Sequence, residues 1–151
     1  FSEVTIAISN LRLLCQELES KYFGPINQFQ LTPKILLFTL ENENHTFGSY
    51  LAALKLKKEG FNAQVAIGYS ESDLFKLLEF GGFQLVGLSI GSESMINQGN
   101  MITDRIRKNF ALPSAAGGSF VTHHKTLSKT CLDVDLLEPT PEEMRVLLEV
   151  N

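Results

Sequence analysis

Short apolar runs and helical repeats alternate along residues 33–151. Four of the apolar runs are followed by residues with helical spacing. The helix after residues 34–40 is expected to be amphipathic, because Phe47, Leu51 and Leu54 recur every three or four positions before a capping Gly60. Strands that alternate with helices predict βαβ units around a parallel sheet. Five apolar runs of strand length are expected to be buried strands, at residues 34–40, 61–67, 83–89, 112–116 and 134–137.

Five parallel strands with right-handed crossovers predict a small α/β domain with a doubly wound sheet. For a domain of this size we expect the flavodoxin-like strand order 2-1-3-4-5, with the less continuous second strand near an edge. Open α/β sheets bind ligands outside the carboxyl ends of their strands, where the strand order reverses. Here that place lies between the first and third strands.

Residues 4–22 carry a different pattern, in which apolar side chains step alternately by four and three positions. This spacing is typical of a coiled-coil seam and predicts an amphipathic helix, which we expect to pack on its own domain rather than to dimerise freely. Gly24 and Pro25 then break the helix. We therefore divide the chain into an N-terminal helix and linker, residues 1–32, and one domain, residues 33–151. The seam residues are Val4, Ile8, Leu11, Cys15, Leu18 and Tyr22.

Composition and charge narrow the class of protein. The chain has 151 residues, 44% of them apolar, and a net charge of −4, which leaves no basic field for direct nucleic-acid binding. Two distant cysteines, Cys15 and Cys131, fit no metal or redox spacing and predict reduced thiols in a cytoplasmic protein. No apolar run reaches the ~20 residues of a transmembrane helix. Because the chain starts at Phe1 rather than Met, we expect it to be a piece of a longer protein.

A polar stretch, Glu43-Asn44-His45-Thr46-Phe47-Gly48, joins the first strand to the first helix. The Glu43 carboxylate can hydrogen-bond one ring nitrogen of His45, which fixes the tautomer and leaves the other nitrogen free to coordinate a metal. A histidine at this strand-to-helix turn lies where parallel sheets hold their ligands.

Three features on consecutive loops at this sheet edge together resemble the cobalamin-binding domain family. The family motif is Asp-x-His-x-x-Gly, then Ser-x-Leu, then Gly-Gly, at closely similar separations. The resemblance covers about residues 33–151 and implies that cobalamin is the cofactor. The matching residues are Glu43-x-His45-x-x-Gly48, Ser89 with Gly91 two positions later, and Gly117-Gly118.

The resemblance implies a role for each matching residue. His45 would replace the base on the lower face of the corrin and bind cobalt, and Glu43 would accept a hydrogen bond from the far ring nitrogen. Ser89 would hydrogen-bond the displaced nucleotide tail or its neighbours. Gly48 and the Gly117-Gly118 pair carry no side chain, so that the backbone can approach the tail.

Two departures from the motif change what it implies. Glu43 stands in place of Asp, a version that resembles the light- or redox-responsive regulators of the family more than its enzymes. Gly91 stands in place of Leu, so a packing contact beside the nucleotide tail is expected to be missing. The stretch His45-Thr46-Phe47-Gly48 also resembles a sensor domain that carries heme instead of cobalamin, found in antirepressors of photosynthesis genes. In that variant His45 would be an axial heme ligand.

Other chemistries fit the sequence less well. Residues 87–91 match the Gly-x-Ser-x-Gly nucleophile elbow, but the elbow needs a helix directly after Ser89, where a longer loop is expected. His123 and His124 follow the glycine pair and are interpreted as solvated loop residues. No Gly-x-Gly-x-x-Gly follows the first strand, which argues against a dinucleotide site.

The function favoured by these features is a regulatory module that binds cobalamin, or heme, through His45 and transmits light, oxygen or redox state to a protein partner. The expected partner is a transcription repressor or another domain of the parent chain, and no catalysis is expected within this chain. Two alternatives stay open: a cobalamin carrier of a methyltransferase or mutase, and a ligand-free interaction module of the same fold.

Overall fold

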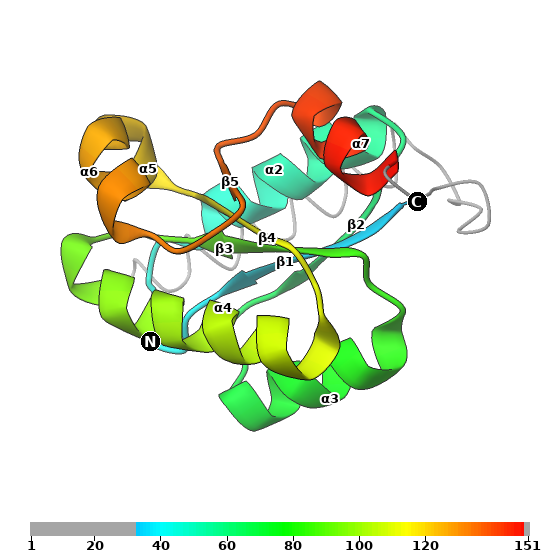
Figure 1. Cartoon of the computed structure of the whole chain (residues 1–151), viewed down its shortest axis with the longest axis horizontal. Helices are drawn as coiled ribbons and strands as arrows, with labels where there is room; N and C mark the ends of the chain where they lie inside the picture. The colour runs from blue at the N-terminus through cyan, green and yellow to red at the C-terminus, as the bar shows by residue number, and fades with distance from the viewer. Residues whose placement is uncertain (1–32, 150–151) are drawn as a thin grey trace, which may run out of the picture.

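A five-stranded parallel sheet, in the order β2-β1-β3-β4-β5, forms the centre of the computed structural model, which describes residues 33–149 (Figure 1). In the register, Leu36 of β1 lies opposite Gln64 of β2 and Val86 of β3. The flavodoxin-like order is confirmed, and β2 is an edge strand. The predictions for residues 1–32 lie outside the described residues. The strands are β1 (Lys34–Thr39), β2 (Asn62–Ala66), β3 (Leu85–Ser89), β4 (Ser114–Gly117) and β5 (Leu136–Leu137).

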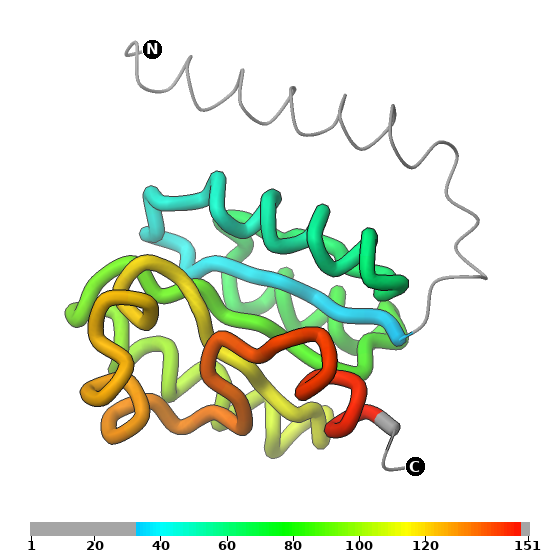
Figure 2. The backbone as a smooth tube through the Cα atoms, turned by 90° about the horizontal axis from the view of Figure 1, so that it is seen from above, coloured from blue at the N-terminus to red at the C-terminus, as the bar shows by residue number. Residues whose placement is uncertain are grey.

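Helices cover both faces of the sheet, with α3 and α4 on one face and α2 and α7 on the other (Figure 1). Seen from above, α2 and α7 lie along the same face, with strands between them in the view (Figure 2). Within residues 33–149, no helix has the length and apolar character needed to cross a membrane. The helices are α2 (Phe47–Lys58), α3 (Glu71–Gly81), the short 3-10 helix η2 (Glu93–Met95), α4 (Ile96–Phe110), α5 (Ser119–His123), α6 (Lys125–Cys131) and α7 (Pro141–Glu149).

The core is divided by the sheet into two clusters. Successive β1 residues alternate between them, as the pleat of a strand requires: Ile35 packs on the α2–α7 side, and Leu36 on the α3–α4 side. Because both faces are covered, β1 is continuously apolar rather than alternating. The smaller cluster, under α2 and α7, consists of Ile35, Ala53, Leu56, Phe61, Ala63, Leu85 and Met144.

Capping residues begin α3 and α7 and end α3. The Ser70 hydroxyl accepts a hydrogen bond from the Asp73 amide at 3.2 Å, and α3 ends at Gly82 in the left-handed region with φ 67°. The Thr140 hydroxyl accepts from the Glu143 amide at 3.1 Å and begins α7. Each of these bonds pairs a terminal amide that the helix itself leaves without a partner.

The buried face of α2 differs from the predicted amphipathic pattern. The residues facing the sheet are Ser49, Ala53 and Leu56, whereas Leu51 is 43% exposed and Leu54 is partly exposed. The helix is therefore apolar on both sides, so the spacing of its large residues did not reveal which side packs on the sheet.

Two short helices, α5 and α6, replace the loop expected between β4 and β5. Their sequences, Ser119–His123 and Lys125–Cys131, are largely polar and too short for a helical repeat to stand out. The prediction that His123 lies in a loop is wrong, because His123 is the last residue of α5. The ring of His124 stacks on Phe120, with the ring centroids 4.7 Å apart.

The end of α4 offers a test of backbone strain. Ala111 caps it with φ 53°, a left-handed conformation that costs an alanine about 1–2 kcal/mol. We expect Ala111→Gly to raise the free energy of unfolding by about 0.5–1 kcal/mol in urea denaturation, the gain being partly offset by the greater freedom of glycine in the unfolded chain. The reverse change at the matching position of α3, Gly82→Ala, should lower it. A loss of stability in Ala111→Gly would contradict this account.

Candidate functional site

The three predicted site loops lie together at the carboxyl edge of the sheet. Thr39 at the end of β1 pairs with Ser89 at the end of β3, and Ser89 in turn pairs with Gly117 at the end of β4. The loops that follow these residues therefore start side by side, so the topology alone gathers residues that are far apart in the sequence.

The carboxylate of Glu43 is the best-connected polar group of the site. Its side chain is only 1% exposed, and it accepts hydrogen bonds from three N–H groups. The Oε1 atom lies 2.8 Å from the His45 amide and 2.9 Å from His45 Nδ1, and Oε2 lies 2.9 Å from the Gly91 amide. A buried carboxylate needs such partners, and here they tie the loop after β1 to the loop after β3.

The His45 ring is held at one nitrogen and open at the other. Its side chain is 75% exposed although its Nδ1 contacts the buried Glu43. The carboxylate can only accept, so Nδ1 carries a hydrogen, and in the neutral imidazole Nε2 then has the lone pair. This is the arrangement in which a histidine is ready to bind a metal.

Gly91 lies against Glu43 rather than leaving a gap. A Cβ atom at position 91 would come within 2.5 Å of Glu43 Oε2. The longer Glu43 side chain occupies the space that a side chain at position 91 would need, and it accepts a hydrogen bond from the Gly91 amide; the expected loss of a contact with the nucleotide tail stays a prediction. The two departures from the family motif, Glu for Asp and Gly for Leu, are sterically matched to each other.

Gly118 and Ser89 join the loops after β4 and β3. Gly118 has φ 103°, and a Cβ there would lie 2.7 Å from the Ile90 carbonyl oxygen and 2.9 Å from Ser89 Oγ. The Ile90 amide donates to the Gly117 carbonyl at 2.8 Å. Gly118 is thus needed for the backbone conformation and the close contact of these loops.

A cavity of about 710 Å³ opens beside these loops, between the sheet and helices α2 and α7. Gly48 and Gly117 border it, and a Cβ at either would meet no atom within 4 Å. The walls consist largely of small or apolar residues, a composition typical of sites for organic ligands. The lining comprises Leu37, Asn44, His45, Thr46, Phe47, Gly48, Ser49, Ala52, Lys55, Leu56, Leu85, Gly87, Leu88, Ser89, Gly91, Ala115, Ala116, Gly117, Gly118, Ser119, Glu138, Pro139, Pro141 and Met144.

Part of this lining was not predicted from the sequence. Glu138 follows β5 with φ 40°, uncommon for a residue other than glycine, and its amide donates to the Ala116 carbonyl at 2.8 Å. The Glu138 carboxylate accepts from Thr122 and lies 3.9 Å from the Lys125 ammonium. No motif marks this residue, because the β4–β5 register brings it to the site. His123 and His124, in contrast, do not border the cavity.

Comparison with known proteins supports the fold and leaves the function open. No family model matches the chain. An uncharacterized 20.5 kDa protein in the bchF-crtJ intergenic region of Rhodobacter capsulatus is 28% identical over 92 residues, which are 61% of this chain and 48% of that protein. The chain thus spans about half the length of this relative.

A solved structure shares the architecture. The 1.5 Å crystal structure of a novel cobalamin-binding protein from Desulfitobacterium hafniense DCB-2 matches with a TM-score of 0.58 and 18% identity, over 77% of this chain and 57% of that one. At this identity the likeness shows that the two chains share a fold and no more.

The contact between Glu43 and Gly91 can be tested by a double-mutant cycle. We expect Gly91→Ala to lower the free energy of unfolding by about 1–3 kcal/mol, because the new Cβ would displace the buried carboxylate. In the background of Glu43→Asp, whose carboxylate is drawn back by one methylene, the same change should cost less, giving a coupling of about 0.5–3 kcal/mol in urea denaturation.

The matched control for this cycle is Gly48→Ala, at a position with open space around the added Cβ. Its effect should stay within about 0.5 kcal/mol. If Gly91→Ala lowered the free energy of unfolding equally with Glu and with Asp at position 43, the two residues would not be sterically matched.

Proposed function

We propose that this chain is a regulatory module that binds cobalamin through His45 and transmits the state of the ligand to a protein partner. The observation that carries the proposal is the buried Glu43 carboxylate, which fixes His45 with its Nε2 lone pair free beside a cavity of about 710 Å³. The catalytic or carrier activity of a longer parent protein is not part of this proposal.

The single ligand His45 suits a metal whose other coordination positions are occupied by a prosthetic group. Among residues 33–149, no group of three or more His, Cys, Asp or Glu side chains is gathered to hold a metal ion. A metal bound by His45 alone therefore needs its other ligands from a prosthetic group, as the nitrogens of a tetrapyrrole ring supply them. Glu43 would then orient the imidazole and raise its basicity.

The cavity favours cobalamin over heme. Cobalamin carries a nucleotide tail that must be accommodated when a histidine replaces its lower base, whereas heme has no such tail. The open space at Gly48 and Gly117 would let the tail pass between the sheet and α2. The likeness in fold to a cobalamin-binding protein supports the same choice.

A sensory role fits the exposure of the site better than catalysis. His45 is exposed, and a corrin on it would rest on the outer surface of the loops, open to a partner. Bound cobalamin would supply a cobalt centre whose axial ligands and oxidation state respond to light and redox conditions. Glu43 and Gly91 link His45 to the loop that leads into α4, so this chain has a direct contact through which a change at the histidine reaches another element.

Absorption spectroscopy tests the role of His45. On titration of the full chain with hydroxocobalamin, we expect a shifted visible spectrum that is absent in His45→Ala, because an imidazole bound to cobalt changes the absorbance of the cobalt centre and alanine has no group that could replace it. Hemin is titrated separately. A shift with hemin alone would assign the heme variant, and unchanged spectra with both would reject ligand binding by this chain.

Filling the cavity distinguishes the two ligands further. Gly117→Val adds a side chain where no atom lies within 4 Å, so the fold should be retained. The affinity for hydroxocobalamin should fall about tenfold or more, equivalent to ~1.4 kcal/mol, while any hemin binding should be unaffected. Equal hydroxocobalamin affinity in Gly117→Val and the unaltered chain would show that the tail does not occupy the cavity.

A further inference from the structure

The outward side of α2 carries three apolar residues and one lysine with coiled-coil spacing. Phe47, Leu51, Leu54 and Lys58 step by four, three and four positions, and they lie opposite the residues that face the sheet. Leu51 is 43% exposed, although a leucine at the centre of such a stripe is usually covered. We call these four residues the α2 stripe.

The same steps occur in the N-terminal segment. Leu11, Cys15, Leu18 and Tyr22 also step by four, three and four positions, so each lies 36 positions before one member of the α2 stripe. Two helices with the same seam spacing can pair along their whole length when they run in parallel, with equivalent seam positions side by side. Cys15 would then face Leu51, and Leu18 would face Leu54.

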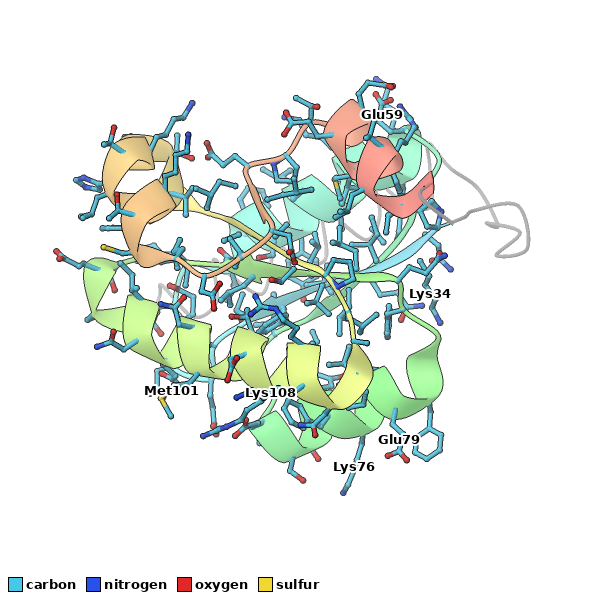
Figure 3. All side chains as sticks on the ribbon, viewed as in Figure 1. Lys34, Glu59, Lys76, Glu79, Met101 and Lys108 are labelled. Carbon is cyan, nitrogen blue, oxygen red and sulfur yellow. The ribbon has the colours of Figure 1, made fainter. Side chains whose placement is uncertain are left out.

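The path of the chain sets the direction of such a pairing. The Asn62 amide at the start of β2 donates to the Pro33 carbonyl at 3.0 Å, so the chain reaches β1 at the end of the sheet where α2 finishes. Figure 3 shows Glu59, directly after α2, and Lys34, the first residue of β1, at the same end of the molecule. A helix that ends near residue 22 can therefore finish beside the end of α2, with residues 23–32 as the connection.

The charges fit this parallel direction. The C-terminal half of α2 carries Lys55, Lys57 and Lys58. The C-terminal half of the segment carries Glu17 and Glu19 against one basic residue, Lys21, so a parallel arrangement brings a net negative charge beside these lysines.

We propose that residues 4–22 of this chain form a helix that docks on the α2 stripe, parallel to α2, with Cys15 against Leu51. The helix α2 would then lie between the sheet and this segment, which would cover the side chain of Leu51. The docking does not rest on cobalamin binding, since Leu51 and Leu54 lie on the side of α2 that faces away from the sheet and do not line the cavity, which Phe47 alone of the α2 stripe borders.

Disulfide trapping tests the register in the full chain. Leu51→Cys is combined with Cys131→Ser, so that Cys15 and the new thiol are the only two cysteines. A disulfide requires Cα atoms about 4.4–6.8 Å apart, which facing seam positions satisfy. We expect an intramolecular disulfide under mild oxidation, recognised by mass and by faster migration without reductant.

The matched control is Met101→Cys with Cys131→Ser. Met101 is 53% exposed and projects from α4, on the other side of the sheet from α2 (Figure 3). Cross-linking to Cys15 should be about tenfold slower or more than at position 51, because no docking raises the local thiol concentration there. Similar rates at both positions, no cross-link at position 51, or a covalent dimer through position 51 would each overturn the proposal, the dimer identifying a second copy as the occupant.

Hydrogen exchange gives a second, independent readout. In the unaltered chain, amides of residues 4–22 should be protected, and Leu51→Glu should remove this protection while that of the strands is retained. Val146→Glu, a change at a 65% exposed position of α7, should leave residues 4–22 protected. Protection of residues 4–22 that is unaffected by Leu51→Glu would reject docking on the α2 stripe.

Discussion

The candidate site depends on one buried carboxylate. An ionised carboxylate loses its hydration when it is buried, and it is tolerated only when enough donors replace the water. Glu43 meets this requirement with the amides of His45 and Gly91 and the ring of His45. The same bonds fix the tautomer and direction of His45 and hold the loops after β1 and β3 together. The bond from the Gly91 amide to the second carboxylate oxygen is the polar contact that links the loop after β1 directly to the loop after β3 through Glu43.

The cavity and the exposed stripe follow from the orientation of α2. This helix turns Ser49 and Ala53 to the sheet, where Gly87 and Ala115 contribute little volume, and a cavity is left between them. Protein interiors are normally closely packed, so a cavity of about 710 Å³ forgoes contacts that would otherwise stabilise the fold. Phe47, Leu51 and Leu54 lie on its other side, which places Leu51 at the surface. The cavity and the exposed Leu51 thus lie on opposite sides of one helix.

Helix α2 also lies between the proposed ligand site and the proposed docking surface. It begins at Phe47, two residues after His45, and its outward side is the proposed surface for residues 4–22. A metal of a bound cofactor that drew His45 toward itself would displace the first turn of α2. A helix docked on the α2 stripe would contact the same element. Packed helices shift as units because their interfaces accept only certain arrangements.

The sequence by itself determined the strand order, the helix caps and the residues that gather at the sheet edge. These features rest on local chemistry: buried strands are continuously apolar, Ser70 and Thr140 pair free amides, and parallel strands bring their carboxyl ends together. Tertiary structure alone decided which side of α2 is buried and that Glu138 borders the cavity. It also decided that Glu43 occupies the space beside Gly91. A helix that is apolar on both sides does not show in its sequence which side is buried, and a contact between residues 48 positions apart leaves no periodic pattern.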